Sequence, residues 1–77
     1  MNNKLKIAIL GMGYVGLPLA VEFGMKYQTI GFDIDNVKIN SLKKFEDINN
    51  EIDKNSIKRS SNLEFTNKIT DLKKSNI

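Results

Sequence analysis

The fold is decided by residues 6–33, which run KIAILGMGYVGLPLAVEFGMKYQTIGFD. A short, mostly apolar run, residues 5–10, is followed directly by glycine, and this pattern predicts a buried β-strand. A second run of β-favouring side chains, residues 28–33, predicts a second strand. The segment between them, residues 14–26, is expected to form the helix that connects the two strands.

This connecting segment carries apolar side chains around most of a helical cylinder. Val15, Leu19 and Phe23 recur every four residues, and further apolar residues widen that stripe on both sides. Such a helix is expected to be buried on more than one side. Pro18 is tolerated only near the first helical turn, where few backbone N–H groups have intrahelical partners, so the helix should start close to residue 13 or 14.

The chain then continues with a second helix, which Asp35 or Asn36 can cap. Val37, Ile39 and Leu42 are expected to lie on roughly one side of this helix. Lysines follow at its end, where the helix dipole favours positive charge.

The second half of the chain carries weaker signals. A short helix is expected within residues 50–59, residues 63–66 alternate like a strand, and Ile69 with Leu72 indicates one more helical turn. The order strand, helix, strand, helix, connection, strand predicts an α/β fold, the N-terminal part of a doubly wound parallel sheet of β-α-β-α-β type. Residues 1–77 are interpreted as one partial domain, with no second domain.

Composition limits the class of protein. The 77 residues contain no Cys and no His, which excludes a disulfide framework, a Cys/His metal site and a thiol or imidazole catalyst within them, and we expect no metal. The net charge is +3, with lysines spread along the chain, which indicates solubility and no nucleic-acid partner. The longest uncharged stretch, residues 7–21, is interrupted by glycines and the lone proline, so no membrane span is expected. The N-terminus lacks the features of a signal peptide, which predicts a cytoplasmic protein.

Residues 11–16, GMGYVG, form a G-x-G-x-x-G motif. The motif follows one expected strand, opens the expected helix and lies within a βαβ unit of about 30 residues. Asp33, at the end of the second strand, stands 22 positions after Gly11 (33 − 11), close to the spacing of about 20 that dinucleotide-binding folds show. Strand, glycines, helix and acid together predict a dinucleotide-binding site of the Rossmann type.

Each residue of the motif has its own physical task at such a site. Gly11 permits the tight turn out of the strand, Gly13 has no Cβ and lets a pyrophosphate approach the backbone, and Gly16 lets the helix lie close to the sheet. The N–H groups of Tyr14 and Val15 lie at the helix start, where they lack intrahelical partners and the helix dipole favours an anion.

The Asp33 carboxylate can accept hydrogen bonds from the hydroxyls of the adenosine ribose. It would also repel a 2′-phosphate, and no Arg follows it directly, so NAD is predicted over NADP.

Simpler interpretations stay open for the neighbours of these residues. The ring of Tyr14 can be plain surface. Gly31 can be a site of close packing, Asp35 a helix cap and Lys38 a solvated helix lysine.

Residues 6–24 and 31–35 resemble the N-terminus of the UDP-glucose/GDP-mannose dehydrogenase family. The likeness is strongest to the branch that oxidises UDP-N-acetylhexosamines for bacterial capsule and O-antigen polysaccharides, and residues 63–66 and 69–74 also look like that branch. The resemblance implies that the chain is the N-terminal piece of a longer, homo-oligomeric enzyme. It further implies two successive NAD-dependent oxidations of a sugar C6 hydroxyl to a carboxylate.

The catalytic Cys of that family cannot lie in a chain without Cys, so the resemblance assigns no catalytic residue here, and the chain alone is expected to be inactive. What the resemblance carries over is NAD binding. It implies that Gly13, Tyr14 and Val15 meet the pyrophosphate. It also implies that Asp33 meets the ribose and that Lys38, five positions later, contacts the adenosine side. The UDP-sugar substrate is expected to bind to parts outside the chain.

A non-catalytic, NAD-sensing regulatory module of the Rossmann type is the alternative, and the sequence after Ile77 would separate the two. In the strand order 3-2-1-4-5-6 that is usual for such sheets, the first strand pairs with the fourth. Residues 5–10 are therefore expected at an exposed apolar edge, a site of aggregation. For these reasons the isolated chain is expected to be marginally folded and to bind NAD weakly.

Overall fold

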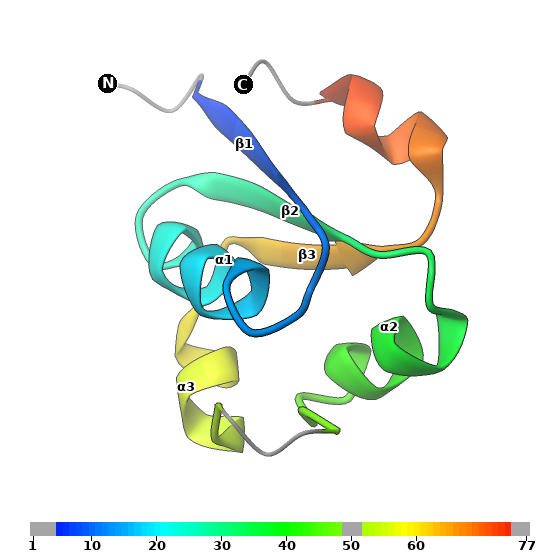
Figure 1. Cartoon of the computed structure of the whole chain (residues 1–77). Helices are drawn as coiled ribbons and strands as arrows, with labels where there is room; N and C mark the ends of the chain where they lie inside the picture. Colours follow the sequence, from blue (N-terminus) through cyan, green and yellow to red (C-terminus); the bar gives the residue numbers. More distant parts are fainter. Residues whose placement is uncertain (1–4, 49–51, 75–77) are drawn as a thin grey trace.

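The computed structural model describes residues 5–48 and 52–74, and a three-stranded parallel sheet forms its centre (Figure 1). The strands are β1 (Lys6–Leu10), β2 (Gln28–Phe32) and β3 (Leu63–Thr66). β2 lies in the middle, and its Gly31 stands between Ile9 of β1 and Phe65 of β3. The predicted α/β fold with a parallel sheet is confirmed, with β1 at one edge of the described sheet.

The described residues also form four helical segments. These are α1 (Gly16–Gly24), α2 (Asn36–Lys43), α3 (Lys54–Arg59) and the 3₁₀ helix η1 (Ile69–Lys74). In Figure 1, α1, α2 and α3 lie on one side of the sheet and η1 on the other. The Asp35 carboxylate accepts a hydrogen bond from the N–H of Lys38 at 3.1 Å, and Asp53 accepts one from the N–H of Ser56 at 2.8 Å. Both acids are therefore N-caps, which confirms Asp35 as the start of the second helix.

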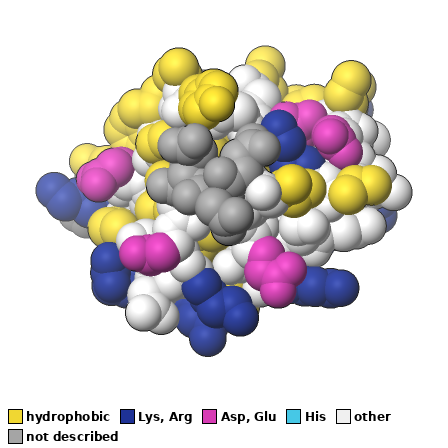
Figure 2. All heavy atoms as spheres, turned by 60° about the horizontal axis from the view of Figure 1, so that its bottom comes forward, with side chains coloured by type: hydrophobic (Ala, Val, Ile, Leu, Met, Phe, Trp, Pro, Cys, Tyr) yellow, Lys and Arg dark blue, Asp and Glu magenta, His cyan; other side chains and the backbone are white. Residues whose placement is uncertain are grey.

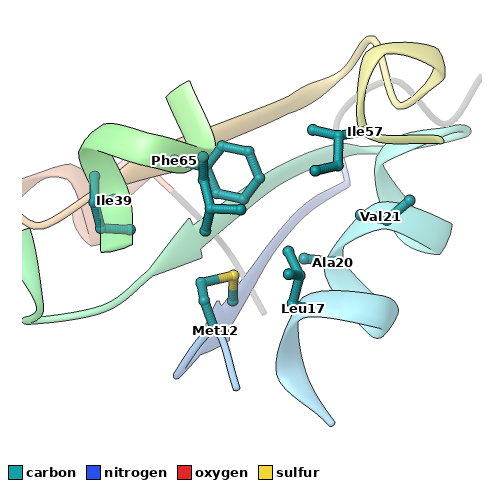
Figure 3. Packing of buried hydrophobic residues seen from close by; sticks show 8 residues of the cluster. Met12, Leu17, Ala20, Val21, Ile39, Ile57 and Phe65 are labelled. Atoms are coloured by element: carbon teal, nitrogen blue, oxygen red, sulfur yellow. The ribbon is translucent and has the colours of Figure 1, made fainter. Parts of the chain in front are cut away.

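The core lies between the sheet and the three helices α1, α2 and α3 (Figure 3). Its buried members come from all three helices, from β3 and from the loop after β1: Met12, Leu17, Ala20, Val21, Ile39, Leu42, Ile57 and Phe65. Because Met12 belongs to the loop that carries the glycine motif, core packing also fixes the position of that loop.

A buried hydrogen bond ties α1 to the segment that leads into β3. The hydroxyl of Ser60 donates to the backbone carbonyl of Val21 at 2.7 Å, and both residues are buried. Val21 lies in the last turn of α1, where carbonyls lack intrahelical N–H partners. A Cβ on Gly24 would stand 2.2 Å from the Ser60 hydroxyl oxygen, so the glycine allows this close approach.

Replacing Ser60 by alanine should lower the free energy of unfolding by about 1–3 kcal/mol, because the Val21 carbonyl then stays buried without this donor. Urea unfolding of the purified protein measures the change. Ser61→Ala is the matched control, because Ser61 is exposed, and its effect should stay below about 0.5 kcal/mol. Equal stability of Ser60→Ala and the wild type would show that the hydrogen bond contributes nothing.

The burial of α1 differs from what the sequence predicts. Val15, Leu19 and Phe23 are exposed, with 73% of the Val15 surface accessible, whereas Leu17 and Val21 are buried. The helix is therefore buried on one side. The reason is the sheet order, since β1 is an edge strand and no described element beyond it reaches the outer stripe of α1.

Two further expectations are corrected. Regular α1 begins at Gly16, although the N–H of Leu17 already donates to the Gly13 carbonyl at 3.1 Å and so closes the first helical turn. Val37 is 68% exposed and does not share the buried face of α2. At about 100° per residue, Val37 stands about 200° around the helix from Ile39, on nearly the opposite side.

Charged groups of both signs share the molecular surface. On the face shown in Figure 2, outside its grey atoms, Lys and Arg side chains are interspersed with Asp and Glu. In residues 5–48 and 52–74, no helix combines the length and the apolar character that crossing a lipid bilayer requires.

Candidate nucleotide-binding site

The loop after β1 turns sharply and is fixed to the neighbouring strand. The N–H of Gly11 donates to the carbonyl of Phe32 at 2.7 Å, so the loop starts beside the carboxyl end of β2. Gly11 has a φ of 92°, in the region that glycine adopts without a Cβ penalty. The sequence prediction of a tight turn at Gly11 agrees with this backbone.

The other two glycines of the motif differ in what surrounds them. A Cβ on Gly16 would stand 1.7 Å from the carbonyl oxygen of Gly11, so the helix start lies directly against the end of β1. A Cβ on Gly13 would meet nothing within 4 Å. Gly16 is therefore required by packing within the loop, whereas Gly13 leaves its side of the loop open to a ligand.

The backbone N–H groups of Gly13, Tyr14 and Val15 are available at the start of α1. No described residue accepts a hydrogen bond from any of the three. Free N–H groups at a helix start, beside a glycine that leaves open space, form the arrangement that binds phosphate groups. The residues present thus fit the pyrophosphate of a dinucleotide.

The Asp33 carboxylate is joined directly to this loop. Its Oδ2 accepts a hydrogen bond from the N–H of Met12 at 2.8 Å, and its Oδ1 accepts one from the N–H of Asp35 at 2.9 Å. One side chain therefore links the glycine loop to the turn between β2 and α2. The acid stands beside the loop, as the sequence spacing predicted.

Two opposing effects act on the Asp33 carboxyl group. Partial burial alone would raise its pKa. Hydrogen bonds from the N–H groups of Met12, Asp35 and Ile34, together with the positive charge of Lys38, outweigh burial and hold the pKa below its usual value. The carboxylate is therefore charged at neutral pH and can accept hydrogen bonds from hydroxyl groups.

The lowered pKa predicts a loss of stability in acid. A carboxyl group with a lower pKa in the folded state stabilises the fold above its unfolded pKa, about 4 for Asp, and this stabilisation is lost as the pH falls through the folded pKa. Below about pH 4, the free energy of unfolding should therefore fall more steeply in the wild type than in Asp33→Asn, which has no carboxyl group there to titrate.

Urea unfolding at a series of pH values from about 6 to about 3 measures this difference. Asp53, whose pKa is also lowered by hydrogen bonds from Ser56, titrates in both proteins and cancels in the comparison. Parallel pH profiles of the two proteins would contradict the prediction.

The structure places the remaining residues of interest as follows. Lys38 lies near enough to Asp33 for its positive charge to act on that carboxylate. The Tyr14 side chain is exposed. A Cβ on Gly31 would stand 2.7 Å from the Met12 sulfur, so Gly31 is a site of close packing, as one interpretation of the sequence held.

Sequence analysis missed several residues at this end of the sheet. Met12 occupies a variable position of the motif, yet its side chain is buried and its N–H holds Asp33. Asn67 follows β3 as Asp33 follows β2, and its Nδ2 donates to Oδ1 of Asn36 at 2.6 Å. A polar residue directly after β2 and again after β3 was the available signal for Asn67, because parallel strands end at one edge of a sheet. Nothing in the sequence marked Met12.

Comparison with known proteins identifies the type of site. Residues 5–77 match the sequence profile of the UDP-glucose/GDP-mannose dehydrogenase family, NAD binding domain. The chain belongs to this family. The family resemblance stated from the sequence is thereby confirmed, and NAD is the cofactor of this dehydrogenase domain.

Relatives of the family agree with this assignment. The chain is 48% identical over 75 residues to UDP-N-acetyl-D-glucosamine 6-dehydrogenase of Pseudomonas aeruginosa, covering 97% of this chain and 18% of that protein. It is 49% identical over 74 residues to Protein CapL of Staphylococcus aureus, covering 96% of this chain and 17% of that protein.

A solved dehydrogenase structure shows the same fold. The UDP-D-ManNAc dehydrogenase from Pyrococcus horikoshii matches with a TM-score of 0.81 and 32% sequence identity, over 94% of this chain and 18% of that chain. The Rossmann-type fold is confirmed. The chain spans less than a fifth of the length of each of these three relatives.

Proposed function

We propose that residues 1–77 form the N-terminal part of the NAD-binding domain of a longer UDP-sugar dehydrogenase. The whole enzyme oxidises the C6 hydroxyl of a UDP-N-acetylhexosamine to a carboxylate. The observation that carries the site is the hydrogen bond of 2.8 Å from the Met12 N–H to the Asp33 carboxylate. This contact supports the proposal, because a carboxylate suited to accept hydrogen bonds from ribose hydroxyls then stands beside the loop whose N–H groups suit a pyrophosphate.

Seven residues make up the cofactor site in this proposal: Gly11, Gly13, Tyr14, Val15, Gly16, Asp33 and Lys38. The backbone N–H groups of Gly13, Tyr14 and Val15 hold the pyrophosphate, and the lysine contributes its charge on the adenosine side. The Asp33 carboxylate holds the ribose and repels the 2′-phosphate of NADP. NAD, when bound, supplies the hydride acceptor for the oxidation of the sugar alcohol.

The remaining machinery lies outside these 77 residues. The chain contains no Cys, so the thiol implied by the family resemblance comes from another part of the enzyme, as does the UDP-sugar site. The 77 residues alone are therefore inactive in this proposal. The whole protein is cytoplasmic and homo-oligomeric, and its sugar-acid product serves bacterial polysaccharide synthesis.

Turnover assays of the full-length protein test the proposal. Purified protein is supplied with NAD and, in separate reactions, with UDP-N-acetylglucosamine, UDP-N-acetylmannosamine or UDP-glucose, while NADH absorbance is recorded. We expect NADH formation with an acetylated substrate, two NADH for each sugar, and little with NADP in place of NAD. NAD binding without turnover of any UDP-sugar would favour the non-catalytic regulatory module.

A further inference from the structure

A pair of amide side chains joins the ends of β2 and β3 beside Asp33. The N–H of Asp33 donates to the carbonyl of Thr66 at 3.2 Å, so both strands end at the same level. Asn67 follows Thr66, and its Nδ2 donates to Oδ1 of Asn36, the first residue of α2, at 2.6 Å. The pair therefore stands at the edge of the sheet where the ribose acceptor lies.

The remaining atoms of this amide pair form a donor and an acceptor. Once Nδ2 of Asn67 has donated to Asn36, Oδ1 of Asn67, an acceptor, and Nδ2 of Asn36, a donor, bond to none of the described residues. Exchanging oxygen and nitrogen in both amides leaves one free donor and one free acceptor again. Asn36 is exposed and Asn67 is half-buried, so a ligand can reach the pair.

An exposed apolar side chain, that of Ile34, stands between Asp33 and Asn36 in the sequence. Ile34 directly follows Asp33 and has 82% of its surface accessible. Its backbone N–H is one of the groups that lower the pKa of the Asp33 carboxyl, so Ile34 stands next to the group that is proposed to hold the ribose. A flat aromatic base can cover this side chain and remove apolar surface from water.

We infer that Asn36 and Asn67 together bind the hydrogen-bonding edge of the adenine base of NAD, with Ile34 under its ring. This inference rests on the proposed cofactor site, because it extends outward from the ribose that Asp33 holds. Adenine is attached to that same ribose. Its N6 amino group is a donor and the adjacent ring nitrogens are acceptors, the pattern that an amide donor and acceptor complement.

A cofactor analogue with a blocked base edge tests the inference in the full-length protein. In 1,N6-etheno-NAD, a two-carbon bridge closes N1 and N6, so the base loses its amino donor and its N1 acceptor. Calorimetric titration should show wild-type protein binding NAD roughly 5- to 100-fold more tightly than the etheno analogue. In Asn36→Ala and Asn67→Ala, NAD affinity should fall and that ratio should approach one.

The matched control is Asn40→Ala, because Asn40 is an exposed asparagine of the same helix that does not belong to the amide pair. It should keep the wild-type ratio, and thermal unfolding should show all three variants to be as stable as the wild type. An unchanged ratio in both Asn36→Ala and Asn67→Ala, or an equal loss of affinity for both dinucleotides, would overturn the inference. So would a wild type that binds both equally. Failure of the wild type to bind NAD at all would instead overturn the proposed function, and the inference with it.

Discussion

Gly16→Ala is expected to destabilise the domain by about 3 kcal/mol or more and to abolish NAD binding. The added Cβ would stand 1.7 Å from the carbonyl oxygen of Gly11 and 2.9 Å from its carbonyl carbon. Both are backbone atoms, and the Gly11 N–H is itself bonded to Phe32 of β2. The steric overlap can therefore be removed only by a shift of the loop or of the start of α1, and either shift disturbs the core. Urea unfolding and calorimetric titration with NAD measure the two effects.

Gly13→Ala is the matched control for this change. Its Cβ meets nothing within 4 Å, so stability should remain within about 0.5 kcal/mol of the wild type. The methyl group nevertheless stands where the pyrophosphate is proposed to approach, and NAD affinity should fall by about tenfold or more. Wild-type stability of Gly16→Ala would show that the loop can move freely. Wild-type NAD affinity of Gly13→Ala would remove the argument for close backbone approach.

Asp33→Ala is expected to lower the affinity for NAD by about 10- to 100-fold and to weaken the preference for NAD over NADP. Hydrogen bonds to a charged carboxylate are worth about 1.5–3 kcal/mol each, and the substitution removes those that are proposed to hold the ribose. It also removes the acceptor of the Met12 N–H, so the glycine loop loses its link to the turn before α2. Without the negative charge, the 2′-phosphate of NADP is no longer repelled.

Titrations of the full-length protein with both dinucleotides measure this effect. Asp53→Ala serves as the control, since the Asp53 carboxylate likewise accepts a backbone hydrogen bond, here from the Ser56 N–H as the N-cap of α3, and is not part of the proposed site. Its NAD-to-NADP affinity ratio should equal that of the wild type. If Asp33→Ala kept that ratio as well, the assignment of Asp33 to the ribose would be wrong.

Strands, helices and the acid beside the glycine loop were predictable because their signals are local. A run of β-favouring residues ending in glycine marks β1, and Asp35 and Asp53 mark helix starts by the same cap geometry. Burial was less predictable. Periodicity shows that Val15 and Leu19 share a side of α1, but the sheet order decides whether a neighbour covers that side.

The contacts that complete the site depend on distant parts of the chain. The Met12 N–H reaches a carboxylate 21 positions away, and Asn36 and Asn67 are 31 positions apart. Neither pairing leaves a periodic trace in the sequence. Both contacts arise because the parallel strands end at one edge of the sheet. The order of the strands must therefore be known before these contacts can be predicted.

The place of β1 at the sheet edge has a consequence for how the proposed longer enzyme is made. Leu10 of this strand and Val15 of the following loop are exposed, and β1 leaves the ribosome before β2 and β3. In a doubly wound sheet the first strand ends up central, so its second neighbour is synthesised only after β3. Until then the nascent polypeptide shows an unpaired apolar rim, and a chaperone that shields emerging chains would act on this rim.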